Sequence, residues 1–255
     1  MATNNFLRSI PPATRHLLLL NIGIWLFSFI ALQFKGFDLS WFLGLHFFTS
    51  PAFNPVQLVT YMFLHDSTGF AHIFFNMFSL YMFGRVLEQV MGTKRFLFFY
   101  LSTGIGAALI QLAVIFFQIE FITSQIPKAE LFQTLQIIHT EGAQALQNGM
   151  NYTDPLVGEL NGLINGTMIG ASGAVFGILL AFGMLFPNVP LYLFFIPVPI
   201  KAKYMVIGYG LLELFFGISG AVSGVAHFAH LGGLLVGLII ILIWKKKGIV
   251  GGGYF

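Results

Sequence analysis

The chain has 255 residues, of which 57% are hydrophobic and 8% are charged, and its mean hydropathy is +0.85. This composition excludes an ordinary water-soluble domain, in which about 25% of residues are charged, and it indicates an integral membrane protein. The net charge is only +3 and cysteine is absent, so we expect no nucleic-acid partner, no disulfide and no thiolate nucleophile or metal ligand.

An apolar segment at residues 17–34 follows Arg8 and Arg15 and predicts the first membrane-spanning helix. The segment is long enough to cross a bilayer, so we expect an uncleaved helix rather than a signal peptide. The two arginines predict that residues 1–16 lie in the cytoplasm.

Residues 35–69 alternate aromatic side chains with Gly, Pro, Asn and Asp. This pattern is too broken for a span and is typical of a segment in the membrane interface. Helices two and three are predicted at about 72–90 and 96–119. The basic turn between them, at residues 92–95, belongs on the cytoplasmic side.

A polar segment follows at about residues 120–166. Within it, Leu131, Leu135 and Ile138 recur at helical spacing, which favours a short amphipathic helix on the membrane surface. An ordinary solvated loop is the alternative interpretation.

Helix four is predicted to begin near Ser172 and to end by Phe186, because prolines follow at 187 and 190. A helix of about fifteen residues rises about 22 Å, which is less than the roughly 30 Å of a hydrocarbon core. Ser172 is therefore predicted to lie below the outer surface, with residues 161–170 filling the gap. Because non-helical backbone at this depth must face protein or water, we expect a cavity beside Ser172.

Helices five and six are predicted at about 204–218 and 230–244, followed by three consecutive lysines. Among the twelve Lys and Arg residues, only Lys35 and Lys128 fall in outer segments, which agrees with the positive-inside rule. The predicted fold class is an all-α membrane protein, a six-transmembrane-helix bundle with a short helix four that starts inside the membrane. The predicted domains are a cytoplasmic segment at 1–16, a core at 17–244 with a polar outer insertion at about 120–166, and a cytoplasmic tail at 245–255.

The outer ends of helices two, four and six each carry polar residues in this topology. A serine hydroxyl needs a base to become a nucleophile, and His230 on helix six can serve Ser172 on helix four. His72 and Asn76 are spaced i, i+4 on helix two and, with the Ser172 amide, can supply hydrogen bonds to an oxyanion. These are the groups that acyl transfer requires. The alternative is that His72 and Asn76 only join helices.

Glycines predict how helices four and six come together. Gly173 and Gly177 form a small face on helix four, and Gly233 and Gly237 form another on helix six. Such faces let two helix backbones approach closely in a membrane. We therefore expect these helices to pack directly, which would bring the predicted base to the serine.

Three motifs now support a family resemblance: His-Ile-Phe-Phe-Asn at 72–76, Gly-Ala-Ser-Gly at 170–173, and Ala-His-Leu-Gly-Gly at 229–233 followed by Gly237. In this order and spacing the chain resembles the rhomboid intramembrane serine proteases, from residue 57 onward. The resemblance implies that Ser172 is the nucleophile and His230 the general base, without cofactor or metal. It also implies that His72, Asn76 and the Ser172 amide form the oxyanion hole.

Two departures from the family pattern stand outside the catalytic set. The Trp-Arg pair that is frequent in the first outer loop is replaced by Val56 and Gln57, so any anchoring by that pair must be met otherwise. The insertion at about 120–166 is also longer than a compact bacterial core requires.

Three further side chains have open roles. His227 precedes His230 on the same helical side, but only His230 fits the family pattern Ala-His-x-x-Gly-x-x-x-Gly, so His227 is interpreted as a rim or structural residue. Glu213 on helix five could orient a histidine as a third catalytic member. Because the family typically works with a Ser/His pair, we favour a structural carboxyl. Glu88 is expected to be structural through pairing or loop contacts.

The resemblance implies an endopeptidase that cleaves transmembrane helices of single-pass or multi-pass substrates near the outer membrane face through an acyl-enzyme. The expected environment is the lipid bilayer of a cell membrane, with both termini cytoplasmic, and the compactness of the chain suggests a bacterial inner membrane.

Three alternatives remain at this stage. A catalytically silent relative would keep the fold and bind client helices. A channel or transporter could use intramembrane histidines, but the chain has no internal repeat. A metal site could form from histidines, yet no intramembrane carboxylate or thiolate joins them at a recognised spacing; these histidines are His65, His72, His227 and His230.

Overall fold

The computed structural model describes residues 7–193, 196–220 and 224–251. Within these ranges, four helices are long and apolar enough to cross a membrane, and a fifth apolar helix is shorter. The four are α2 (Pro12–Lys35), α7 (Thr93–Thr123), α12 (Ala202–Ser219) and α13 (His227–Lys246), and the shorter one is α11 (Ser172–Leu185). The chain is therefore a helical, multi-pass membrane protein.

The predicted second span is one uninterrupted run over 71–91 that consists of three pieces. They are α5 (Ala71–Ser79), the π-helical turn η2 (Leu80–Gly84) and α6 (Arg85–Met91). A π turn inserts one extra residue into a helix and changes which side chains face the core beyond it. Because no single piece of this run is long enough to count as a span and α11 is short, the count of six spans stays a prediction.

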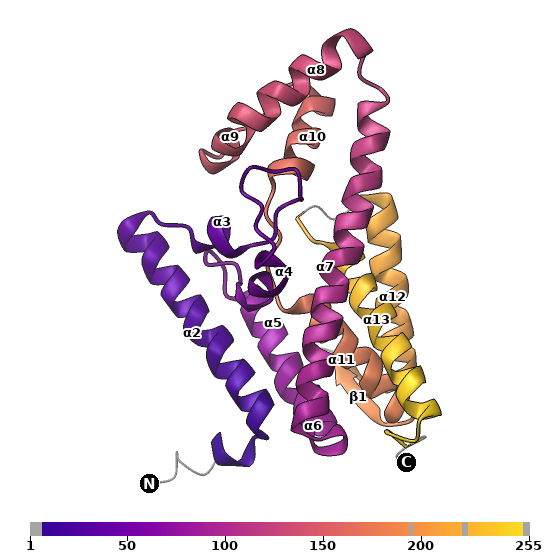
Figure 1. Ribbon diagram of the computed structural model, residues 1–255. Helices are drawn as coiled ribbons and strands as arrows, with labels where there is room; N and C mark the ends of the chain where they lie inside the picture. The colour runs from indigo at the N-terminus through magenta and orange to yellow at the C-terminus, as the bar shows by residue number, and fades with distance from the viewer. Residues whose placement is uncertain (1–6, 194–195, 221–223, 252–255) are drawn as a thin grey trace.

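The helices run between two ends of the molecule (Figure 1). The start of α2, the helix α6 and the end of α13 lie at one end, and the helices of the polar insertion lie at the other. Both ends of the chain thus approach the same side, as the predicted topology requires. Which side faces the cytoplasm stays a prediction.

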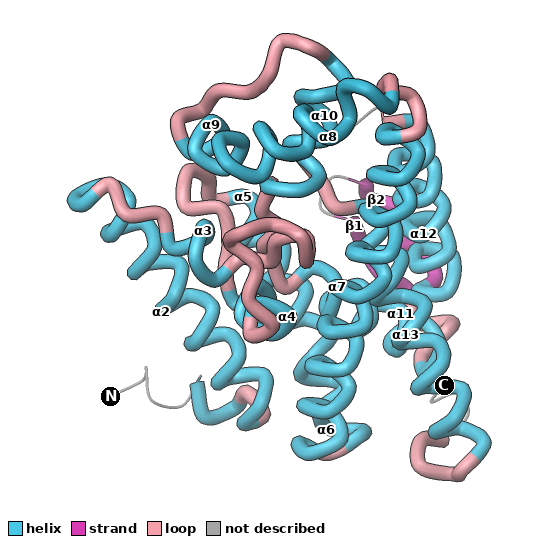
Figure 2. The backbone as a smooth tube through the Cα atoms, turned by 45° about the horizontal axis from the view of Figure 1, so that its top comes forward, coloured by secondary structure: helices cyan, strands magenta, loops and turns pink. Residues whose placement is uncertain are grey.

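A β-hairpin lies between the predicted helices four and five and departs from a purely α fold. Strands β1 (Pro190–Leu193) and β2 (Ile196–Lys201) are antiparallel, with Leu191 opposite Ile200, and Figure 2 shows them in magenta. Prolines fit a two-stranded hairpin because every strand is an edge and only some N–H groups are needed. The proline-rich sequence had indicated a loop.

The polar insertion is helical. The helical interpretation of residues 131–138 is therefore confirmed, and the alternative of a solvated loop is not. It contains α8 (Lys128–Ile137), the π turn η3 (Ile138–Gly142), α9 (Ala143–Gln147) and α10 (Pro155–Asn165). Ile138 is fully buried with Leu160 and Ile164 in a second apolar cluster that includes Ile122 at the end of α7. The insertion therefore folds onto the C-terminal end of α7 (Figure 2).

Helix α11 packs against both α7 and α13, and the prediction that glycines bring α11 and α13 together is confirmed. A Cβ added at Gly233 would collide with the Gly173 carbonyl, and one added at Gly237 would lie 3.2 Å from the Gly177 Cα. Gly173 itself contacts Ala107, near the midpoint of α7. The start of α11 is therefore level with the middle of the longest span.

Gln57, one of the two residues that stand in place of the Trp-Arg pair, anchors the segment around it. It begins the short helix α4 (Gln57–Thr60), and its side chain is fully buried. Its Nε2 donates hydrogen bonds to the carbonyls of Phe42 and Ala52, and its Oε1 accepts from the amides of His46 and Asn54. One neutral side chain thus joins both arms of the segment at residues 35–69, which is called the interface loop after its predicted location.

Glu88 is structural, as expected. Its buried carboxylate accepts hydrogen bonds from the amides of Ala13 and Thr14 at 2.9 and 2.7 Å, and from the hydroxyls of Thr14 and Thr93 at 2.8 Å each. These donors lie in the first turns of α2 and α7, where backbone N–H groups lack helical partners. Glu88 therefore fastens two helix starts to α6.

Candidate active site

The segment before Ser172 is irregular and is held by the interface loop. Leu45 and Met168 exchange backbone hydrogen bonds of 2.9 Å, and the Gly170 amide donates to the Tyr61 carbonyl at 3.0 Å. Gly170 has φ +125°, and an added Cβ would lie 2.8 Å from Nε2 of His72. Only glycine fits this backbone so close to an imidazole.

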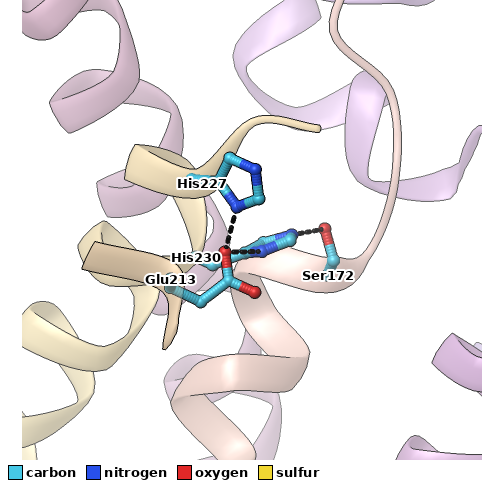
Figure 3. Close-up of polar contacts among 4 residues, drawn as sticks. All are labelled: Ser172, Glu213, His227 and His230. Carbon is cyan, nitrogen blue, oxygen red and sulfur yellow. Dashed lines mark hydrogen bonds and ion pairs between the residues drawn. The ribbon is translucent and has the colours of Figure 1, made fainter. Parts of the chain in front are cut away.

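Ser172 and His230 meet between α11 and α13. The two atoms that face each other are Ser172 Oγ and His230 Nε2, 2.8 Å apart (Figure 3). His230 is 8% exposed, and Ser172 is partly exposed. The close glycine packing of the two helices accounts for this distance, because bulkier residues would hold the backbones apart.

Phe176 fixes the plane of the His230 ring. The residue lies one turn after Ser172 on α11, and its ring is stacked on the imidazole with centroids 4.3 Å apart and planes at 7°. The face of the ring is covered, so its two nitrogens point along defined directions. This stacking partner was missed at the sequence level, although its i+4 spacing from Ser172 placed it on the same helix face.

Glu213 on α12 approaches both histidines of α13. Its Oε2 lies 2.6 Å from Nδ1 of His227 and 3.0 Å from Nδ1 of His230, with its side chain 14% exposed (Figure 3). Sequence reasoning named all three residues but did not place the carboxylate between the two rings. The available signal was one acidic residue in a late span together with two histidines at i, i+3.

The same three residues form the one candidate metal cluster found in the described ranges, with ligand atoms within 4.8 Å of one another. A carboxylate does therefore join two of the intramembrane histidines, which the sequence spacing did not reveal. Two ligands of one tetrahedral zinc ion stand roughly 3.3 Å apart, which is longer than the 2.6 Å between Glu213 and His227. The geometry fits a hydrogen bond better than a shared ion.

His72 and Asn76 lie on α5 on the other side of the serine. The Asp66 amide donates to Nδ1 of His72 at 3.4 Å, which leaves Nε2 to carry the ring proton, and this atom faces Gly170. The Asn76 side chain is buried, and its Nδ2 donates to the His72 carbonyl at 3.0 Å. No hydrogen bond joins either side chain to Ser172 within the described ranges.

A hollow of about 210 Å³ is lined by His227 together with Gln111 and Gln118 of α7. Neither Ser172 nor His230 lines this hollow. The cavity expected beside the serine therefore stays a prediction.

Fold and site together define a membrane-embedded helical protein with a serine–histidine contact between two closely packed helices. The family model of the Rhomboid domain matches residues 52–119 and 134–247, so the chain belongs to the rhomboid family, as the resemblance implied. Members of this family are generally intramembrane serine proteases. A search of curated protein sequences gives no match. The residues between the two matched ranges lie in the polar insertion, where the chain was expected to depart from a compact core.

Proposed function

We propose that the chain is an intramembrane serine endopeptidase with Ser172 as nucleophile and His230 as general base. The observation that carries the proposal is the 2.8 Å contact between Ser172 Oγ and His230 Nε2. The contact lies level with the middle of α7, at a depth where polar side chains are costly and mark functional sites. Its members stand in the motifs that prompted the family resemblance.

The reaction follows from the placement of the atoms. His230 Nε2 takes the proton of the Ser172 hydroxyl while Oγ bonds to the substrate carbonyl carbon, whose oxygen gains the negative charge. The C–N bond then breaks, and His230 returns its proton to the leaving nitrogen. In the second half, His230 takes a proton from water as the water oxygen bonds to the acyl carbon, and the ester bond to Ser172 breaks as Oγ regains a proton.

In this proposal three groups stabilise the oxyanion. His72 Nε2 carries a proton in the tautomer that the Asp66 amide favours, the Asn76 amide has a second N–H beyond the one used within α5, and the Ser172 amide opens α11. Fixed donors of this kind in a site that excludes water are worth several kcal/mol in the transition state.

The substrate class follows from the site's location. A bond reaches Ser172 only as part of a segment within or next to the membrane, so the substrates are membrane proteins whose helices unwind locally at the cleavage site. Small or helix-destabilising residues are expected there, because a regular helix has its carbonyls engaged.

The topology proposal keeps the six-span core at 17–244, with the segments 1–16 and 245–255 in the cytoplasm and the cleavage site toward the outer face of a bacterial inner membrane. The basic residues at both ends of the chain support this orientation. The first six residues of the N-terminal segment and the last four of the tail lie outside the described residues.

The decisive experiment measures labelling by a fluorophosphonate and cleavage of a model transmembrane substrate in proteoliposomes. We expect both in the wild type, and we expect Ser172→Ala to abolish labelling and to reduce cleavage by about 10⁴-fold or more. Ser124→Ala, at an exposed serine after α7, is the matched control and should behave like the wild type.

Equal cleavage by wild type and Ser172→Ala would refute the assignment. A wild type that binds transmembrane peptides but neither labels nor cleaves would identify a silent, client-binding member of the family instead.

A further inference from the structure

The proposed role of His230 as a base depends on which of its two ring nitrogens carries the proton. A neutral imidazole carries one proton, and Nε2 can accept the serine proton only when the ring's own proton is on Nδ1. His230 Nδ1 is buried, and in the part of the chain that the structure describes it has no hydrogen-bond partner. The charged group near it is Glu213, whose Oε2 lies 3.0 Å away.

The position of Glu213 Oε2 is fixed by a second histidine. His227 Nδ1 lies 2.6 Å from the same oxygen, which is a short hydrogen bond between an imidazole and a carboxylate. His227 belongs to the first turn of α13 and Glu213 to α12. The His227 ring thus holds the Glu213 carboxylate against α13, next to the His230 ring.

The two tautomers of His230 differ sharply in this setting. With the proton on Nδ1, the N–H dipole meets a carboxylate oxygen, although the bond is not directed straight at it. With the proton on Nε2, the Nδ1 lone pair would face that oxygen at 3.0 Å and repel it. In a site of low dielectric this difference is large enough to select one tautomer.

The contact between His230 and Glu213 becomes stronger during the reaction. When His230 takes the serine proton, its ring becomes an imidazolium that sits between the reacting oxygen and the Glu213 carboxylate. Attraction between these opposite charges arises only as the transition state forms, so it lowers the barrier rather than strengthening substrate binding.

Resting on the proposed roles of Ser172 and His230, we infer that Glu213 is a positioning residue that keeps the His230 proton on Nδ1, with His227 holding its carboxylate in place. Glu213 acts through His230 and does not touch the substrate. The serine–histidine pair is thereby extended to a chain of four side chains across α11, α12 and α13 (Figure 3).

A purely structural role would make different predictions. If Glu213 only fastens α12 to α13, its loss lowers stability and leaves the His230 tautomer unchanged. The positioning role predicts a change of tautomer and a loss of kcat with KM preserved, because the contact matters most in the transition state.

The test compares the wild type, Glu213→Gln and the control Glu159→Gln as full-length protein in detergent micelles. Glu159 is an exposed glutamate on α10. Nitrogen NMR of histidine-labelled protein identifies the protonated ring nitrogen of each histidine, and the His230 signals are those lost in His230→Asn. Parallel assays give kcat and KM on a transmembrane substrate, and thermal unfolding reports the fold.

We expect wild-type His230 and that of Glu159→Gln to carry the proton on Nδ1. In Glu213→Gln we expect a substantial Nε2–H population and a kcat reduced by about tenfold or more, with KM changed less than twofold. Glu213→Asp keeps the charge on a shorter arm and should recover part of kcat.

Three results would overturn the inference: an Nε2–H tautomer in wild-type His230, an unchanged tautomer in folded Glu213→Gln, or an unchanged kcat in that variant. The first of these does not depend on Glu213→Gln, so it decides even if that variant does not fold. A wild type that neither labels nor cleaves contradicts the proposed function, whereas the NMR measurement needs no turnover and still decides whether Glu213 controls His230.

Discussion

Two carboxylates within the helix bundle, Glu88 on α6 and Glu213 on α12, have opposite surroundings. Glu88 is 2% exposed, and each of its oxygens accepts two hydrogen bonds from backbone amides or threonine hydroxyls. Glu213 meets two ionisable rings through a single oxygen, and one of these contacts is not a directed hydrogen bond. The first carboxylate is satisfied by fixed donors, and the second faces groups whose protonation can change.

The difference separates a structural from a functional use of the same side chain. Donors that cannot lose their proton give Glu88 a constant environment, so its whole contribution goes into holding helices together. Imidazoles that gain and lose protons couple Glu213 to chemistry. Buried polar groups in this protein can therefore be divided into those whose partners keep their protonation state and those whose partners can change it.

Replacing Glu88 is expected to have the largest effect on stability. Glu88→Ala leaves two backbone N–H groups at the start of α2 and two threonine hydroxyls without their acceptor. We expect a loss of about 4 kcal/mol or more in the free energy of unfolding, since each of the four unsatisfied groups costs about 1–3 kcal/mol. Unfolding by titration with denaturing detergent measures it.

Glu141→Ala, at an exposed glutamate in η3, is the control and should change stability by less than about 0.5 kcal/mol. The contrast between the two carboxylates would be broken if Glu88→Ala unfolded like the wild type, or if Glu213→Gln proved the less stable of the two variants.

Gln57 extends the contrast to a neutral side chain and should have the next largest effect. Gln57→Leu keeps the bulk but removes two donors and one acceptor that bridge the arms of the interface loop. We expect a loss of about 2 kcal/mol and faster amide hydrogen exchange at His46 and Asn54. Gln133→Leu, at an exposed glutamine on α8, should leave exchange in this loop unchanged; equal exchange in both variants would contradict an anchoring role.

The sequence predicted the helices and the serine–histidine contact because both follow from one-dimensional rules. Apolar length and flanking charge located the helices, and chain direction brought the starts of α5, α11 and α13 to one side. The glycines at 173, 177, 233 and 237 then identified which two helices approach closely. Both glycine contacts, Gly173 with Gly233 and Gly177 with Gly237, occur in the structure.

The remaining features depend on helix rotation and on packing between distant segments. Nothing in the nearly uniform hydropathy of α12 fixes which way Glu213 points, so its contact with His227 and His230 could not be derived from spacing. The Gln57 hydrogen bonds depend on how an irregular loop folds back on itself. The hairpin at 190–201 was missed because its prolines outweighed its β-branched residues.

Phe176 offers the smallest and finest test, because it changes the orientation of His230 without changing any charge. The stacked ring should contribute about 1 kcal/mol to holding the imidazole plane, and it also favours the imidazolium that forms during catalysis. We expect Phe176→Leu to lower kcat roughly three- to tenfold, with the His230 proton still on Nδ1. Phe121→Leu, at an exposed phenylalanine near the end of α7, is the matched control. If Phe176→Leu shifted the tautomer as strongly as Glu213→Gln, ring orientation rather than the carboxylate would determine which nitrogen of His230 carries the proton. The titratable partners of Glu213 would then not distinguish its role from that of Glu88.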